Sequence, residues 1–272
     1  MEFIKMQGTG NDFIMINALG EKPALGPALI RKLCDRKSGL RPFASKNRSI
    51  GADGVILVLP PAHKGSHFRM RIFNSDGSEA EMCGNGIRCF AKLVYESELS
   101  RCRNLRIDTK GGLMRVRLNV KNDKVNDITV LMPEPRRVED YSDKGLPIPA
   151  GAADVTAVSL SNPHCVMFLK SIDRLPIARY GPAIERHRLF PNRTNVEFVQ
   201  VLGRNRIRMR VWERGAGETL ACGTGACAAV VAGIFRKRLN NAVKVELKGG
   251  ALHIEYAKGK GIYLTGPAEW IL

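Results

Sequence analysis

The chain has 272 residues, of which 44% are hydrophobic and 25% are charged, as in an ordinary soluble globular protein. This composition excludes wholesale disorder and collagen-like repeats, and no stretch reaches the roughly 20 apolar residues that a membrane helix needs. The N-terminus lacks the basic and then apolar segments of a secretory signal, so we expect a cytoplasmic protein.

The charge is strongly basic, with 43 Lys and Arg against 26 Asp and Glu and a formal net charge of +17. Such an excess can indicate nucleic acid, an anionic membrane or an acidic small molecule as partner. The densest basic run, at 204–214, alternates Arg with Ile, Met and Val, as a half-buried strand does. Aromatic residues make up only 6% of the chain. We therefore expect a solvated basic face and no membrane partner, with nucleic-acid binding as the less favoured alternative.

Four elements can be predicted in the first half. Residues 13–17 indicate a strand, so the preceding GTGND does not open a helix as a dinucleotide fingerprint would. FRMRIF at 68–73 alternates apolar and basic residues, which indicates a half-buried strand. After a polar loop, 83–98 has apolar residues at helical spacing and predicts a buried helix. A Gly-Gly turn at 111–112 then starts another strand.

The second half repeats the first. IRMRVWERGAGETLACGTG (207–225) lies over FRMRIFNSDGSEAEMCGNG (68–86) without a gap, and seven of the nineteen positions are identical. The two motifs are 139 residues apart, from Cys83 to Cys222. Further matches lie upstream, where SNPHCVMF (161–168) resembles GNDFIMIN (10–17) and RTNVEFVQV (193–201) resembles IGADGVILV (50–58). Two copies with so long a period indicate a duplicated domain rather than a solenoid.

The repeat predicts an α+β protein of two pseudo-symmetric domains, each a mixed and mainly antiparallel sheet curled around a central buried helix. The second such helix, at 222–238, is almost wholly apolar. The Pro-rich stretch 132–154 separates the halves, so we expect a first domain at 1–130, with 265–272 returning to it, and a second at 131–264. The active site would occupy the cleft between the two domains.

The residues best suited to catalysis are those of the repeated Cys-Gly-x-Gly motif. Seven cysteines without a C-x-x-C pair indicate reduced thiols and no zinc site. A Cys at a helix N-terminus meets unpaired N–H groups and a positive dipole, which can lower its pKa. The alternative for a single motif is a buried Cys beside a Gly-rich turn. Two copies favour two opposed acid/base groups, Cys83 and Cys222, as in a racemase or epimerase that needs no cofactor and no metal.

The motifs together resemble the diaminopimelate epimerase family. The resemblance rests on KMQGTGNDF (5–13), IGADGV (50–55), FNSDGSEAEMCGNGIR (73–88), SNPHCV (161–166), RTNVEFV (193–199) and WERGAGETLACGTGAC (212–227). It implies an enzyme, independent of pyridoxal phosphate, that interconverts LL- and meso-2,6-diaminopimelate in lysine and peptidoglycan precursor biosynthesis and acts as a homodimer. The proline-racemase-like enzymes, which share a Cys pair, remain the alternative on the same scaffold.

The resemblance also implies roles for individual residues. Cys83 and Cys222 would be the acid/base pair, and His164 and Glu213 would tune the pKa of the thiols. The substrate-binding residues would be Asn11, Asn74, Gly84, Asn85, Asn162, Asn195, Glu213, Arg214, Gly223 and Thr224. Taken alone, Asn11 and Asn162 could equally be turn residues and His164 a core histidine.

The chain departs from the family pattern at two places. Residues 38–49 form a longer and more basic insertion than the family pattern leads us to expect. Gly54 stands where some members carry a Gln that contacts substrate, and a glycine cannot make that contact.

Overall fold

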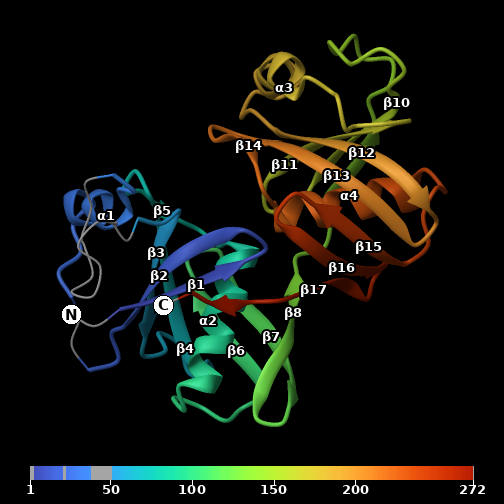
Figure 1. The fold of residues 1–272 in the computed structure, drawn as a ribbon. Coiled ribbons are helices and arrows are strands. Elements are labelled where there is room, and N and C mark those ends of the chain that lie inside the picture. Colours follow the sequence, from blue (N-terminus) through green and yellow to red (C-terminus); the bar gives the residue numbers. More distant parts are fainter. Residues whose placement is uncertain (1–2, 21–22, 38–50, 272) are drawn as a thin grey trace. The chain divides into compact units, whose positions relative to one another are not determined.

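The computed structural model describes residues 3–20, 23–37 and 51–271 (Figure 1). The basic insertion at 38–49 lies outside the described residues. The chain divides into two compact units, one made of residues 1–130 and 266–272 and the other of residues 131–265. None of the helices in the described ranges is long and apolar enough to cross a membrane.

The first unit is a mixed sheet with two helices. Its helices are α1 (Pro27–Cys34) and α2 (Gly84–Glu96). Its strands are β1 (Ile4–Gly8), β2 (Asn11–Asn17), β3 (Gly54–Leu59), β4 (Phe68–Asn74), β5 (Glu79–Ala80), β6 (Asn104–Thr109), β7 (Gly112–Lys121), β8 (Lys124–Met132, which runs on into the second unit) and β18 (Glu269–Trp270).

The second unit has the same kinds of element. Its helices are α3 (Ile177–Glu185) and α4 (Gly223–Phe235). Its strands are β9 (Arg137–Asp140), β10 (Ala153–Ser159), β11 (Pro163–Leu169), β12 (Asn195–Gly203), β13 (Arg206–Glu213), β14 (Gly217–Thr219), β15 (Ala242–Leu247), β16 (Gly250–Ala257) and β17 (Gly261–Gly266).

Strand pairing repeats from one unit to the other. In the first unit β1 to β4, β6 and β7 pair in that order, and the pairings alternate antiparallel, parallel, antiparallel, parallel, antiparallel. In the second unit β10 to β13, β15 and β16 follow the same order and senses. The strand pairings correct the alignment of 50–58 with 193–201, which places Gly54 over Glu197. Ile56 lies opposite Ile72 on the neighbouring strand, as Glu197 lies opposite Val211. Ile56, and not Gly54, is therefore the counterpart of Glu197.

Each sheet curls around one buried helix, as predicted. Every residue of α2 from Gly84 to Tyr95 is buried, and α2 contacts β1 and β2 as well as β7 at the far side of the sheet order. The helix α4 contacts β10, β11, β12 and β16 in the same way. Its small and apolar side chains allow this burial on all sides.

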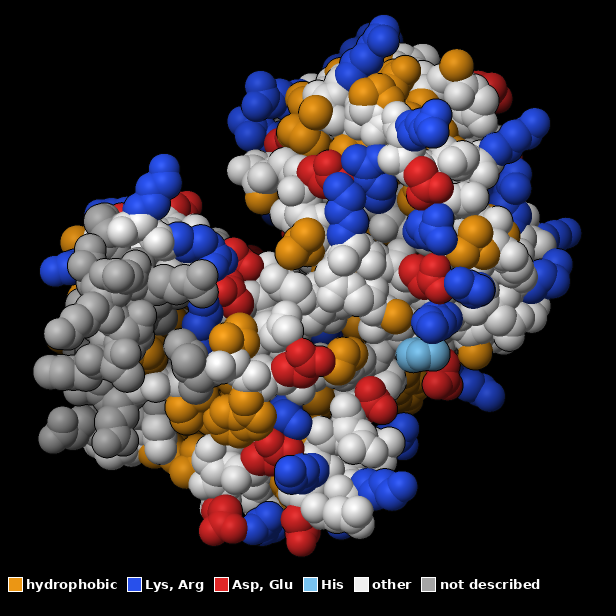
Figure 2. Space-filling model, viewed as in Figure 1, with side chains coloured by type: hydrophobic (Ala, Val, Ile, Leu, Met, Phe, Trp, Pro, Cys, Tyr) orange, Lys and Arg blue, Asp and Glu red, His pale blue; other side chains and the backbone are white. Residues whose placement is uncertain are grey.

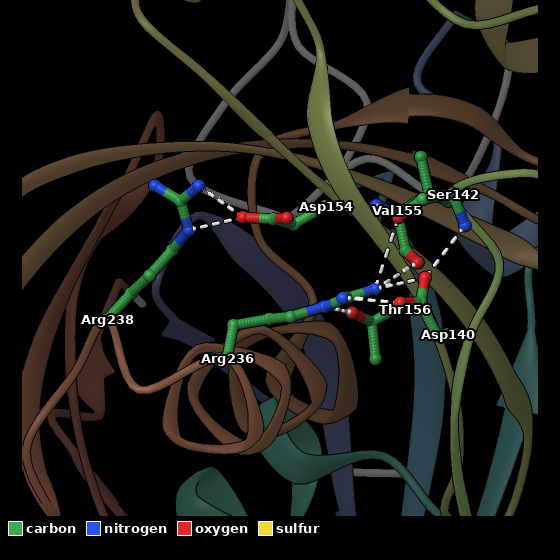
Figure 3. A network of polar contacts seen from close by, with 7 residues as sticks. All are labelled: Asp140, Ser142, Asp154, Val155, Thr156, Arg236 and Arg238. Atoms are coloured by element: carbon green, nitrogen blue, oxygen red, sulfur yellow. Dashed lines mark hydrogen bonds and ion pairs between the residues drawn. The ribbon is translucent and has the colours of Figure 1, made fainter.

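Arg236 ends α4 and ties it to the sheet (Figure 3). Its guanidinium donates to Thr156 Oγ1 at 2.9 Å and to the carbonyl of Val155 at 2.9 Å. It also pairs with Asp140, while the neighbouring Arg238 pairs with Asp154. This network joins the C-terminus of α4 to β9 and β10.

The basic run at 204–214 is β13, whose alternate residues are buried as predicted. Its arginines pair with acids: Arg206 with Glu246, Arg210 with Glu218, and Arg208 with Asp173 and Glu246. On the face that Figure 2 shows, Lys and Arg are scattered and Asp and Glu lie among them. Much of the positive charge on this strand is therefore compensated locally.

The C-terminal segment contributes one strand to each unit. β17 pairs with β16, and β18 then pairs antiparallel with β1, with Trp270 opposite Met6. Pro267 and Ala268 separate the two strands, so residues 261–271 do not form one continuous strand.

Candidate active site

Both cysteines of the repeated motif cap a buried helix. Cys83 is the N-cap of α2 and Cys222 is the N-cap of α4, each in extended backbone conformation. The first helical bonds run from Ile87 N to Cys83 O and from Ala226 N to Cys222 O. Because helical bonding starts there, Gly84 and Asn85 in one unit and Gly223 and Thr224 in the other present N–H groups without helical partners.

In the first unit two of the predicted asparagines lie together. The side-chain amide of the buried Asn85 donates to Asn11 Oδ1 at 2.6 Å, and Asn11 donates in turn to Asp53 Oδ2 at 3.0 Å. Within the described part of the chain, the buried Oδ1 of Asn85 has no hydrogen-bond partner. Asn85 therefore holds Asn11 next to the start of α2, while its own Oδ1 makes no hydrogen bond within the described residues.

Asn74 and Gly54 lie opposite each other on β4 and β3. The amide of the exposed Asn74 donates to Ser78 Oγ at 3.0 Å, so the hairpin ahead of Cys83 orients it. A Cβ at position 54 would lie 2.5 Å from the carbonyl oxygen of Phe73. The strand pairing thus leaves no room for a side chain at Gly54, which explains the glycine there.

In the second unit the sulfur of Cys222 lies at the first turn of α4. The N–H of Gly225 donates to Sγ at 3.3 Å, and Thr224 Oγ1 lies 3.4 Å from Sγ. A Cβ on Gly225 would come within 3.3 Å of Sγ. The glycine therefore allows the backbone to approach the thiol closely.

The expectation that the helix terminus lowers the thiol pKa is wrong for Cys222 in this structure. Burial raises the pKa of Cys222 well above its usual value, and the charges of Glu213 and Glu197 add to the rise. Hydrogen bonds from Thr224 and Gly225 act in the opposite direction and do not outweigh it. Desolvation by the surrounding core therefore outweighs these hydrogen bonds and favours the protonated form of the Cys222 thiol.

Glu213 is the acid that meets this thiol. Its carboxyl bonds to Thr219 Oγ1 at 2.5 Å and to the Cys222 side chain. Burial raises the pKa of Glu213, with a further contribution from the charge of Glu197. A buried carboxyl with a raised pKa beside a cysteine is typical of acid/base sites, which makes Glu213 a candidate partner for proton exchange with Cys222.

A chain of side chains connects His164 to Cys222. His164 Nε2 lies 2.9 Å from Asn162 Oδ1, and Asn162 Nδ2 lies 3.4 Å from Thr224 Oγ1, which contacts the sulfur. Asn162 therefore belongs to the surroundings of the thiol rather than serving only as a turn residue. His164 reaches Cys222 through two intervening side chains.

Asn195 and Arg214 form a second cluster in the same unit. The N–H of Arg214 donates to Asn195 Oδ1 at 2.9 Å, and the Asn195 amide donates to the carbonyl of Pro163 at 3.2 Å. Asn195 is thereby fixed between β11 and the loop after β13. The exposed guanidinium of Arg214 bonds the carbonyl of Asn192 at 3.1 Å.

Three buried charged residues near these positions were not singled out from the sequence. Arg88 bonds Thr9 and the carbonyls of Gly84 and Pro267, which ties the start of α2 to the β1–β2 turn. Glu185 accepts from Trp212 Nε1 and Gly215 N and so supports the end of β13 and the turn after it, where Glu213 and Arg214 lie. Glu197 pairs with His164 at 2.7 Å. The sequence signal that could have identified Glu197 is a charged residue within an otherwise apolar stretch, between Val196 and Phe198.

Within the described ranges no three His, Cys, Asp or Glu side chains gather in a way that could hold a metal ion.

Comparison with known proteins identifies near relatives in sequence. The family described as diaminopimelate epimerase matches residues 3–138 and 156–271. The diaminopimelate epimerase of Moorella thermoacetica is 48% identical over 280 residues, covering 98% of this chain and 96% of that protein. The chloroplastic diaminopimelate epimerase of Oryza sativa subsp. japonica is 43% identical and covers 99% of this chain and 78% of the relative.

Solved structures share the fold at low sequence identity. A PhzF-family phenazine biosynthesis protein of Bacillus anthracis matches with a TM-score of 0.73 at 14% identity, over 100% of this chain and 98% of that chain. A probable proline racemase of Agrobacterium radiobacter K84 matches with a TM-score of 0.70 at 14% identity, over 99% and 90%. These similarities confirm the predicted fold class.

Proposed function

Because the chain belongs to the diaminopimelate epimerase family, we propose that it interconverts LL-2,6-diaminopimelate and meso-2,6-diaminopimelate without a cofactor. The observation that carries this proposal is the 48% identity to a diaminopimelate epimerase over 98% of the chain. The structure supports it with a cysteine at the N-terminus of a buried helix in each unit.

In the proposed reaction, Cys83 and Cys222 act as the two acid/base groups. One cysteine, as thiolate, removes the proton from the α-carbon, and the other, as thiol, delivers a proton to the opposite face of that carbon. The reacting centre inverts and the two cysteines exchange protonation states. Because burial favours the protonated form of Cys222, Glu213, whose carboxyl lies beside this thiol, would accept its proton and return it.

The helix N-termini supply the binding groups. The free N–H groups of Gly84 and Asn85, and of Gly223 and Thr224, would bind the carboxylate of the reacting end, where negative charge builds up as the proton leaves. The distal amino-acid end would be bound by Asn11, Asn74, Asn162, Asn195 and Arg214. The fixed Asn11–Asn85 and Asn195–Arg214 contacts support these roles, since they orient the amides before substrate binds.

We also propose a cytoplasmic homodimer that serves lysine biosynthesis. Sedimentation equilibrium of the purified protein tests the oligomeric state, and a monomer at micromolar concentration would contradict it.

The decisive experiment incubates the protein with LL-diaminopimelate in deuterated water without pyridoxal phosphate. We expect the meso isomer to appear with deuterium at one α-carbon, as measured by chiral chromatography and mass spectrometry. L-Proline serves as the control substrate and should stay unchanged. Deuterium incorporation into proline but not into diaminopimelate would assign the enzyme to the alternative racemase class.

A further inference from the structure

Arg36 joins two carboxylates where the parallel strands β2 and β3 begin. Its guanidinium donates to Asp12 Oδ1 at 2.6 Å and to Asp53 Oδ1 at 2.8 Å. Lys5 pairs with Asp12 at 2.8 Å, so the cluster holds two cations and two anions. Gly51 allows this arrangement, because a Cβ there would lie 2.6 Å from the Cα of Arg36. The loop before β3 can therefore pass close to Arg36 and bring Asp53 against the guanidinium.

The carboxylate of Asp53 holds the side chain of Asn11. Its Oδ1 accepts from the guanidinium of Arg36. Its Oδ2 accepts from Asn11 Nδ2 at 3.0 Å and from the N–H of Asp12 at 3.2 Å. Both oxygens are thus engaged, which fixes the carboxylate beside Asn11. Because the Asp53 side chain is 41% exposed and its arginine partner is exposed too, the ion pair adds little to stability, and the contact with Asn11 points to a role in the site.

Asp53 also decides which end of the Asn11 amide faces it. A carboxylate accepts hydrogen bonds and cannot donate them, so it must face the Nδ2 end of an amide. The Oδ1 end of Asn11 then faces Asn85, whose amide donates to it at 2.6 Å. Turning Asn11 over would place its oxygen against the carboxylate, and Asn85 would have to turn over as well. Asp53 therefore sets the orientation of both amides.

The second unit shows the opposite orientation at the equivalent residue. The pairing of β2 with β3 and of β11 with β12 makes Asn162 the counterpart of Asn11. Asn162 turns its nitrogen, not its oxygen, toward the first turn of its helix, where Nδ2 lies 3.4 Å from Thr224 Oγ1. The counterpart of Asp53 is Thr194, which carries no charge. The duplicated scaffold thus accepts either orientation of this amide, and the carboxylate at position 53 selects one.

We propose that Asp53 is a positioning residue that orients the Asn11 amide so that one of its N–H groups is available to a carboxylate of the substrate. Among the described residues, only Asp53 accepts from the Asn11 side-chain amide, so the second N–H remains for this contact. The two cations of the cluster offset Asp12 and Asp53, so that no net negative charge of the cluster repels the substrate carboxylate. The inference rests on the proposed function in assigning Asn11 to substrate binding.

The first test measures the orientation without substrate. Bonding to a carboxylate should slow solvent exchange of the Asn11 side-chain amide, which NMR detects and the Asn11→Ala variant assigns. In Asp53→Ala we expect this exchange to become about tenfold faster, because a charge-assisted hydrogen bond is lost. The exposed Asn122 is the internal reference. If the Asn11 amide of the wild type exchanges as fast as that of Asn122, the proposal is overturned, and this comparison needs no folded Asp53 variant.

Kinetics provides the second test. Asp53→Ala should raise KM for diaminopimelate about fivefold with little change in kcat, since a hydrogen bond that holds substrate and transition state alike is weakened. The midpoint of thermal unfolding should shift by less than about 4 °C, because the pair with Arg36 is exposed. Asp173→Ala is the matched control, since it breaks an exposed pair with Arg208, and it should leave KM unchanged.

A double-mutant cycle separates a positioning role from direct contact with the substrate. If Asp53 acts through Asn11, the double variant Asn11→Ala with Asp53→Ala should have the same KM as Asn11→Ala alone. Effects on KM that multiply would overturn the proposal, because Asp53 would then act independently of Asn11. Failure of the wild-type protein to epimerise diaminopimelate would refute the proposed function, whereas the exchange measurement judges the orientation of Asn11 separately.

Discussion

Glu197 Oε1 lies so close to the Cα of Gly225 that a Cβ at position 225 would approach this oxygen to 2.8 Å. The carboxyl cannot move aside, since His164 holds it in a fully buried site. At the equivalent glycine of the first unit, Gly86, an added Cβ would lie 2.8 Å from the Cδ1 of Ile56 and 3.1 Å from the Cδ1 of Ile72. The two glycines have the same place in the repeat but different neighbours.

We therefore expect Gly225→Ala and Gly86→Ala to differ. Gly225→Ala should lower the free energy of unfolding by about 2 kcal/mol, because overpacking outweighs the gain in helix propensity. In Gly86→Ala the isoleucine side chains can turn, so the change should stay within about 1 kcal/mol. Urea unfolding of both variants measures the difference. Equal losses in the free energy of unfolding would contradict the conclusion that the Glu197 carboxyl cannot move aside.

Arg236→Ala should destabilise the second unit strongly. The change removes the bonds to Asp140, Thr156 and Val155 that fasten the end of α4 (Figure 3). We expect a loss of about 2–3 kcal/mol, since several charge-assisted bonds disappear together. Arg238→Ala is the matched control, as its pair with Asp154 is partly exposed, and should cost less than about 1 kcal/mol. Similar losses in both would show that the network does not anchor the helix.

Asp12 should make the first unit sensitive to acid. Burial tends to raise its pKa, but hydrogen bonds from Arg36 and Lys5 outweigh burial and lower the pKa from 3.8 to about 2. Because the folded-state pKa is depressed, this contribution is present above pH 3.8 and is lost as the pH falls toward 2. Asp12→Asn should cost about 2 kcal/mol at pH 7. The free energies of unfolding of the wild type and the variant, measured at pH 7 and pH 2, should converge at pH 2. A difference that is the same at both pH values would refute this dependence on Asp12.

The cysteines should fall into two groups. Cys83→Ala and Cys222→Ala should each reduce epimerisation by at least about a hundredfold, because neither cysteine can serve both faces of the α-carbon. Cys89 and Cys227 lie in the same helices with 0% exposure, and burial raises the pKa of Cys89 to about 12. Their alanine variants should keep kcat and lose about 1 kcal/mol of stability. Full activity without Cys83 or Cys222 would remove that residue from the mechanism.

Much of the architecture was predictable because it depends on local patterns. FRMRIF alternates with the period of a strand and became β4. The apolar residues after Cys83 and Cys222 predicted two buried helices, observed as α2 and α4. The repeat of nineteen residues predicted two similar units, because similar patterns of apolar and polar residues favour similar local structure.

The sequence by itself determined the pair of Cys-Gly-x-Gly helix starts and the family to which the chain belongs. Only the tertiary structure showed that burial raises the pKa of the Cys222 thiol, because desolvation depends on everything packed around the sulfur. It alone also paired His164 with Glu197, since the parallel pairing of β11 with β12 brings together residues that are far apart in the chain. This contact follows from the register of the two strands, and neither the spacing of the motifs nor the composition of the chain predicts it.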